Sequence, residues 1–176
     1  ALKHPLEQLA TLTTQFASQL AHFHRLSVKR ALQNGAQRRT TAMLLTDAAK
    51  RVATNDVSLD NWLPKYFQPN SIFTTAPTNH RELKERFNRL TEELKQLDES
   101  LDSVVLHGDP CLPNIIRDQS EQWIFVDLDH CCIANRHIDL AFAIWSLNYN
   151  AGLVFSDSVS TLHLVEMFIK QYNTKT

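Results

Sequence analysis

Apolar residues recur at steps of three and four along several stretches of the chain, which predicts amphipathic helices with one buried face. The expected helices run from about Pro5 to Leu26, Arg38 to Thr54, His80 to about Glu99, His137 to about Asn148 and Ser158 to Tyr172. On the last two, the residues expected to face inward are Leu140, Ala141, Ile144 and Leu147, then Leu162, Val165, Phe168, Ile169 and Tyr172. Asn34-Gly35 is a turn signal between the first two helices. For the helix that begins at His80 a coiled coil is the competing interpretation, but it needs three or more heptads.

Short apolar runs between the helices predict strands. Val104-Val105-Leu106 is expected as a buried strand, and Ile115-Ile116 and Trp123 to Val126 as two further strands. The polar turn Asp118 to Glu121 joins those two strands into a hairpin. The segment from Asn55 to Asn79 is rich in proline and small polar residues, yet its aromatic content favours a loop packed on the core. The predicted fold class is mainly α (α+β), with helices around a small β-hairpin cluster.

Length and charge narrow the class of protein. The chain has 176 residues, which suits one domain or one large lobe, and its 43% apolar content is enough for a core. A net charge of −1 gives no indication of nucleic-acid or membrane-surface binding, and no apolar stretch reaches the ~20 residues of a membrane span. Cys111, Cys131 and Cys132 form no disulfide framework, which favours a reducing cytoplasm.

A polar motif lies directly after the first strand. Residues 107–114 read His-Gly-Asp-Pro-Cys-Leu-Pro-Asn, and Asp127 ends the hairpin. The His, Asp and Asn keep the spacing of the kinase catalytic loop H-R-D-x-x-x-x-N, in which a carboxylate addresses a hydroxyl and an amide and a second carboxylate hold magnesium. A hairpin brings its two ends together, so we expect Asp109, Asn114 and Asp127 to share one magnesium site.

These residues can be given roles. Asp109 is the candidate catalytic base, with an ordinary loop aspartate as the alternative. Asn114 and Asp127 are the candidate magnesium ligands, although either could instead form a turn. His107 is expected to support the loop by hydrogen bonding. Gly108 is expected to allow a backbone shape or a close approach that a side chain would block.

Other polar and aromatic residues nearby leave alternatives open. Asp139 begins a helix, where a carboxylate can cap free N–H groups, and is expected to be structural. Asp129 could assist a metal, meet a cationic substrate or simply be solvated. Trp145 and Tyr149 either pack on the core or form an aromatic wall for a substrate amine. A zinc site is disfavoured because the usual C-x-x-C spacing is missing among His130, Cys131, Cys132 and His137.

The motif resembles the aminoglycoside phosphotransferase and choline kinase family, which shares the protein-kinase-like fold. The similarity rests on His107-Gly108-Asp109, Asn114, Val126-Asp127 and Ile138 to Ala141, and Cys111 to Asn114 is especially similar to aminoglycoside phosphotransferases. Phe23 to Leu26 resembles the L-H-x-L ending found early in the same lobe. The resemblance implies that ATP and Mg2+ are the cofactors and that Asp139 steadies the catalytic loop.

The sequence lacks the glycine-rich motifs that bind nucleotide phosphates. The chain has three glycines and contains neither G-x-G-x-x-G nor G-x-x-x-x-G-K-S/T, and it begins with Ala. We therefore expect residues 1–176 to form a single C-terminal catalytic and substrate lobe. The N-terminal lobe that covers the nucleotide would lie outside this chain, and the fragment alone would be inactive.

The expected function is an ATP- and magnesium-dependent phosphotransferase that acts on a hydroxyl of a small molecule. Candidate acceptors are amino-alcohols such as choline, thiamine-like alcohols and aminoglycosides. The alternative is a non-catalytic, pseudokinase-like or regulatory module. A metal-dependent phosphohydrolase is a weaker alternative, because it would need more metal ligands than this set supplies.

Overall fold

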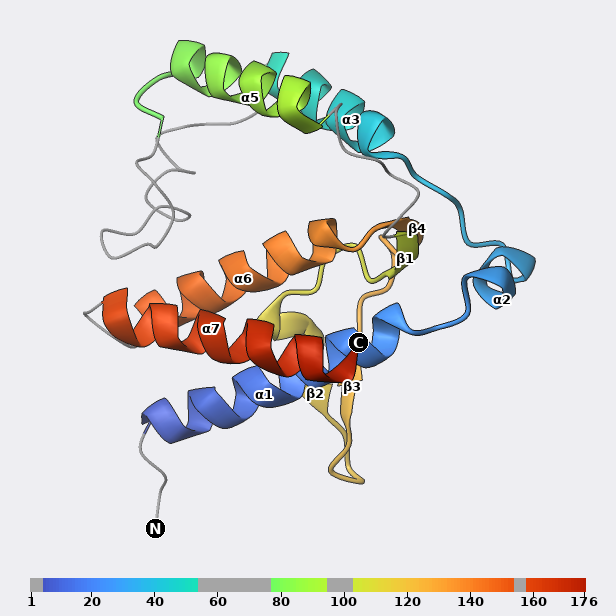
Figure 1. The fold of residues 1–176 in the computed structure, drawn as a ribbon, viewed down its shortest axis with the longest axis vertical. Helices are drawn as coiled ribbons and strands as arrows, with labels where there is room; N and C mark the ends of the chain where they lie inside the picture. The colour runs from blue at the N-terminus through green and yellow to red at the C-terminus, as the bar shows by residue number, and fades with distance from the viewer. Residues whose placement is uncertain (1–4, 54–76, 95–102, 154–157) are drawn as a thin grey trace.

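The computed structural model describes residues 5–53, 77–94, 103–153 and 158–176 (Figure 1). Its helices are α1 (Pro5–His24), α2 (Val28–Gln33), α3 (Thr41–Ala53), α5 (His80–Leu94), α6 (His137–Gly152) and α7 (Ser158–Lys175). Its strands are β1 (Ser103–Leu106), β2 (Ile115–Arg117), β3 (Trp123–Phe125) and β4 (Cys132–Asn135), and a 3-10 turn η1 (Leu112–Asn114) precedes β2. The expected loop from Asn55 to Asn79 lies almost wholly outside the described residues.

The core lies between three long helices. α7 packs along α1 on one side and α6 on the other, and the hairpin lies near the end of α1 (Figure 1). The predicted apolar face of α1 lies in this core, where Phe16 and Leu20 are fully buried. The ring of Phe16 packs against that of Phe168 in α7, with ring centres 5.3 Å apart. This apolar face is therefore what joins the first helix to the last.

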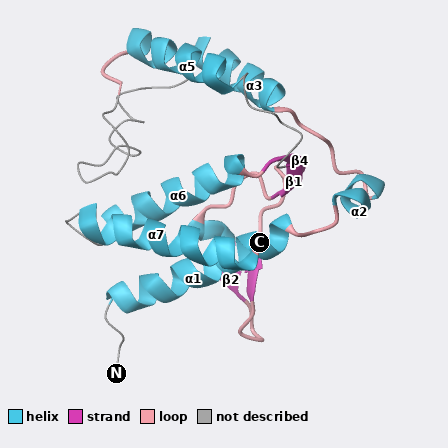
Figure 2. Ribbon diagram, in the orientation of Figure 1, coloured by secondary structure: helices cyan, strands magenta, loops and turns pink. Residues whose placement is uncertain are grey.

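The strands form two small antiparallel pairs, drawn in magenta in Figure 2. β2 and β3 pair from Ile115↔Phe125 to Arg117↔Trp123, which confirms the expected hairpin. In its turn, Asp118 Oδ1 accepts the N–H groups of Ser120 at 2.8 Å and Gln122 at 2.9 Å. Hydrogen bonds from Ser120 and Gln122 lower the pKa of the Asp118 carboxyl group.

β1 pairs with β4, a strand that the sequence pattern did not predict. The stretch Gln37 to Arg39 extends this pair, since Ile133 N–H donates to Gln37 O and Arg39 N–H donates to Ile133 O, both at 2.8 Å. The helix expected from Arg38 therefore begins only at Thr41, where Thr40 Oγ1 accepts the N–H of Met43 at 3.1 Å. Extended pairing with β4 replaces the first helical turn.

The inward faces of α6 and α7 differ in part from the expectation. Leu147, Val165, Phe168 and Tyr172 are buried as expected. Ala141, Leu162 and Ile169 are exposed, so those three assignments were wrong. The face that α6 buries carries the polar residues Asp139, Ser146 and Asn148 together with Ala143, Leu147 and Ala151. Hydrogen bonding of these polar groups fixes the rotation of the helix.

α3 and α5 pack on each other as a helical pair. In Figures 1 and 2 this pair lies on the opposite side of α6 from α1. α5 begins at His80 as expected and is described for 15 residues, fewer than the three heptads of a coiled coil. Its start has a reciprocal cap: Asn79 Oδ1 accepts Glu82 N–H at 2.9 Å and Glu82 Oε2 accepts Thr78 N–H at 2.6 Å. Within the described ranges, no helix combines the length and apolarity that crossing a bilayer requires.

Candidate active site

A buried carboxylate holds the loop that follows β1. Asp139, in the first turn of α6, is completely buried. Its Oδ2 accepts the N–H of His107 at 2.8 Å and its Oδ1 accepts the N–H of Gly108 at 2.9 Å. Asp139 thus binds the backbone at the end of β1, in the loop that the family resemblance had it steady, and does so rather than capping free N–H groups of its own helix.

A histidine and a tyrosine complete this network. His24 Nε2 lies 3.1 Å from Asp139 Oδ2, and His24 Nδ1 lies 2.7 Å from the hydroxyl of Tyr172. The network therefore joins α1, α6 and α7 behind the loop. The sequence placed Tyr172 on the buried face of its helix but predicted neither of these contacts. His24 follows Leu20 by four positions on the apolar face of α1, a spacing that indicates burial.

His107 connects the loop to the far end of the hairpin. Its Nε2 lies 3.0 Å from the carbonyl oxygen of Val126, and its Nδ1 accepts the N–H of Asp109 at 3.3 Å. A carbonyl can only accept and an amide N–H can only donate, so these partners assign the Nε2–H tautomer. The ring packs against Phe125 at 4.8 Å and Phe23 at 5.8 Å. His107 therefore holds the residue that immediately precedes Asp127.

Gly108 occupies a position that no other residue fits. Its φ is +88°, in the left-handed region. A Cβ atom at this position would lie 2.2 Å from the carbonyl oxygen of His130. The positive φ and the close approach of the His130 carbonyl each exclude a side chain at position 108.

Asp109 is held by its neighbours in the loop. Asn114 Nδ2 donates to the Asp109 carbonyl at 2.9 Å and to Asp109 Oδ2 at 3.3 Å. Cys111 Sγ donates to Asp109 Oδ1 at 2.8 Å. Burial, together with the hydrogen bond to Asp109, raises the pKa of the Cys111 thiol to about 12, so the sulfur keeps its proton.

Asp127 is brought to the same region by the backbone. Val126 N–H donates to Asn114 O at 2.9 Å, while the Val126 carbonyl meets His107, so Asp127 follows a residue held on both sides. Asp127 has a φ of +61° and an exposed side chain. Aspartate is one of the few non-glycine residues that adopts this conformation readily.

The remaining candidate residues lie farther along the chain. Asp129 and His130 are exposed. Trp145 and Tyr149 are half-buried on α6 and stack on each other with ring centres 5.7 Å apart. Across the part of the chain that the structure describes, no three His, Cys, Asp or Glu side chains converge as a metal cluster.

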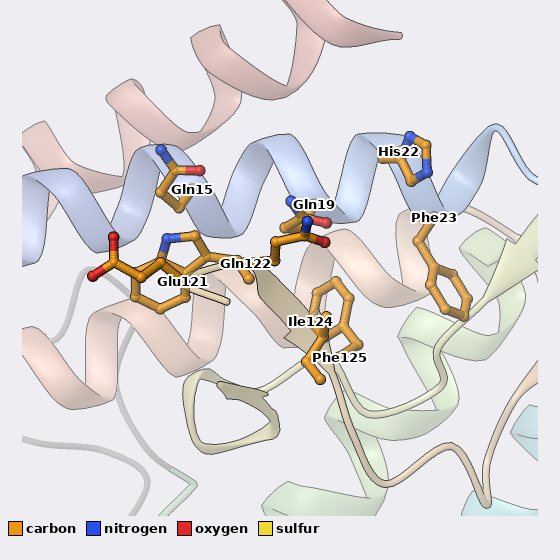
Figure 3. A pocket seen from close by; sticks show the side chains of 9 residues that line it. Gln15, Gln19, His22, Phe23, Glu121, Gln122, Ile124 and Phe125 are labelled. Atoms are coloured by element: carbon orange, nitrogen blue, oxygen red, sulfur yellow. The ribbon is translucent and has the colours of Figure 1, made fainter. Parts of the chain in front are cut away.

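A shallow pocket of about 620 Å3 lies between α1 and the hairpin (Figure 3). Gln19, His22 and Phe23 of α1 face Ile124 and Phe125 of β3 across it. None of the residues predicted for the site lines this pocket. The candidate catalytic residues lie instead around the loop between β1 and β2.

The fold is that of the C-terminal lobe of a protein-kinase-like protein. The sequence pattern of the phosphotransferase enzyme family matches residues 2–160, and the chain belongs to that family. An aminoglycoside 3'-phosphotransferase of Niallia circulans is 30% identical over 128 residues, which cover 66% of this chain and 48% of that protein. A probable aminoglycoside 3'-phosphotransferase of Lactococcus lactis is 52% identical over 48 residues, covering 27% of this chain and 18% of its own length.

Solved structures agree with this assignment at the level of fold. The aminoglycoside phosphotransferase of Streptomyces rimosus, in complex with ADP and streptomycin, matches 94% of this chain with a TM-score of 0.68 and 23% identity. The match covers 57% of the Streptomyces rimosus chain. The expected fold class, the C-terminal lobe of a protein-kinase-like fold, is confirmed. The chain spans about half the length of the relatives it matches most extensively.

Replacing Gly108 with alanine should distort the loop far more than replacing Gly35, which has a similar φ of +90° but open space around it. We expect Gly35→Ala to cost about 1 kcal/mol of stability from backbone strain alone. Gly108→Ala should cost at least about 2 kcal/mol more, because the new Cβ displaces the His130 backbone. Urea unfolding of both variants measures the difference, and equal losses would contradict the close contact.

Replacing Asp139 with asparagine should destabilise the protein by about 3 kcal/mol, since the amide cannot accept all the hydrogen bonds that the carboxylate accepts. Tyr172→Phe, which removes only the outer hydroxyl of the network, should cost about 1 kcal/mol. Urea midpoints provide the measurement. An Asp139→Asn variant as stable as the wild type would show that the loop does not depend on this carboxylate.

Proposed function

We propose that this chain provides the catalytic lobe of an ATP- and magnesium-dependent phosphotransferase that phosphorylates a hydroxyl of a small molecule. The observation that carries the proposal is the loop itself: Asp109 is hydrogen-bonded to Asn114 within a loop that the buried Asp139 holds. Aminoglycosides are the first acceptors to test, since the relatives include aminoglycoside phosphotransferases. Amino-alcohols and thiamine-like alcohols follow.

In this proposal Asp109 acts on the acceptor hydroxyl. Its carboxylate accepts the hydroxyl proton while the oxygen attacks the γ-phosphorus of ATP. A new P–O bond forms to the acceptor, the bond to the β-phosphate oxygen breaks, and ADP leaves with that electron pair. The contribution of the loop is to fix the carboxylate before the substrate arrives, which favours reaction by positioning.

Asn114 and Asp127 suit a magnesium ion. Asn114 uses its amide nitrogen on Asp109, so its amide oxygen is the atom available to a cation. Asp127 adds an exposed carboxylate next to the residue that binds Asn114 O. Oxygen donors of these kinds are the ligands that magnesium takes, together with several waters. When bound, the ion would neutralise charge on the nucleotide phosphates.

We further propose that a second, nucleotide-covering lobe packs on the outer face of the hairpin. Ile116 and Ile124 pair across β2 and β3, and both are exposed, as is Leu128 beside Asp127. Such neighbouring apolar side chains are typical of a surface that another unit covers. The residues 1–176 would then form one lobe of a two-lobed enzyme.

The acceptor side is proposed to involve α6. Trp145 and Tyr149 form a stacked, half-buried aromatic pair there, and Asp129 carries an exposed carboxylate. An aromatic face and an acid both attract a protonated amine. These residues are candidates for contact with an amino group of the acceptor.

Replacing Asp109 with alanine in the intact protein should lower turnover about 1000-fold, the scale of general base catalysis, without loss of folding. Streptomycin, choline and thiamine serve as acceptors, with ADP release and the mass of the phosphorylated product as readouts. Glu166→Ala, an exposed carboxylate on α7, is the control and should match the wild type. Removing magnesium with a chelator should stop the reaction, and adding it back should restore it. Near-normal turnover of Asp109→Ala would refute the assignment, and absence of turnover with every acceptor would favour a non-catalytic module.

Residues 1–176 alone should bind ATP poorly compared with the intact protein, because half of the nucleotide cleft would be missing. Isothermal calorimetry with ATP and magnesium on both forms provides the comparison. Micromolar affinity in the isolated chain would refute the two-lobe proposal while leaving the role of Asp109 open to the preceding test.

A further inference from the structure

The two oxygens of the Asp109 carboxylate are held differently. Oδ1 accepts the thiol of Cys111 at 2.8 Å, a short contact for a sulfur donor. Oδ2 has a longer contact, 3.3 Å, with Asn114 Nδ2. A thiol is a weak donor to a neutral acceptor, but an ionised carboxylate strengthens the bond. Oδ1 is therefore the anchored oxygen, and Oδ2 is the oxygen that retains acceptor capacity for a substrate hydroxyl.

The backbone next to Cys111 is held by a buried residue of α6. Ser146 Oγ accepts the N–H of Leu112, the residue that follows Cys111, at 2.9 Å. Asn150 Nδ2 donates to the Ser146 carbonyl at 2.7 Å and lies 3.4 Å from its hydroxyl. α6 is thus linked through Ser146 to the Leu112 backbone, and the adjacent Cys111 is hydrogen-bonded to Asp109.

We propose that Cys111 is a positioning residue for phosphoryl transfer: its S–H anchors Oδ1 of Asp109 so that Oδ2 faces the acceptor hydroxyl. The inference rests on the proposed function, in which Asp109 is the base. Cys111 does not touch the substrate and exchanges no proton with it. Its sulfur acts only through the orientation of the Asp109 carboxylate.

The kinetic consequence follows from orientation. Without the thiol, the Asp109 carboxylate keeps only the longer contact and can rotate about its side-chain bonds. Displacements of about 1 Å at a reacting group cost up to about 100-fold in rate, and partial restraint by Asn114 leads us to expect about 10-fold here. Binding of ATP and acceptor should change little, because neither substrate contacts the sulfur.

The test compares Cys111→Ala with Cys111→Ser in the intact protein, with streptomycin as the acceptor probe. We expect kcat of Cys111→Ala to fall about 10-fold with both KM values within about 2-fold of the wild type. Cys111→Ser should recover most of the loss, because a hydroxyl can donate to Oδ1. Cys131→Ala, which removes another half-buried thiol, is the matched control and should leave kcat unchanged. Wild-type kcat in Cys111→Ala, or equal losses in the alanine and serine variants, would overturn the inference.

A spectroscopic measurement separates this inference from the proposed function. The infrared S–H stretch of Cys111 is isolated as the difference between the wild type and Cys111→Ser. We expect this band at lower frequency in the wild type than in an Asp109→Ala background, where the acceptor is gone. An unchanged band would overturn the thiol contact even in an active enzyme. A shifted band without turnover on any acceptor would instead overturn the proposed function and, with it, the positioning role.

Discussion

The arrangement of the site depends on one buried carboxylate. Asp139 has no exposed surface, and a charge in that position is tolerated only when donors surround it. It receives the N–H groups of His107 and Gly108 and the Nε2 of His24. Those donors come from the loop after β1 and from α1, while Asp139 belongs to α6. The need to satisfy this carboxylate therefore sets how three segments meet, and Tyr172 adds α7 through His24.

The residues of this network differ in burial, and the buried ones support those with proposed chemistry. His24, His107 and Asp139 are buried, whereas Asp109 and Asn114 are partly exposed and Asp127 is exposed. Buried hydrogen-bonded groups resist movement because any displacement leaves a donor or acceptor unsatisfied. The side chains with proposed chemistry thus lie on a layer of buried, hydrogen-bonded groups and are themselves at least partly exposed.

The sequence predicted the parts of this layout that are local. The spacing from His107 to Asn114 and the turn at Asp118 are properties of adjacent residues, and periodicity located α1 and the buried Phe16. The contacts of His24 with Asp139 and Tyr172 join residues 115 and 148 positions apart, which no local pattern encodes. β4 was missed because it is stabilised by segments distant in the sequence, β1 and Gln37 to Arg39. The buried face of α6 was assigned by hydrophobicity, although Ser146 and Asp139 decide it by hydrogen bonding.

Two backbone turns of unusual conformation shape the loops that carry Asp109 and Asp127. Gly108 and Asp127 both have positive φ, and each follows closely after a strand. The two turns touch: the Gly108 position abuts the His130 carbonyl, and Val126 is bound through its N–H to Asn114 and through its carbonyl to His107. The spacing between the loops is therefore fixed by main-chain contacts and by one imidazole, without help from the carboxylates themselves. The positions of the two loops are therefore set by the folded chain itself, through backbone contacts that need no bound ligand.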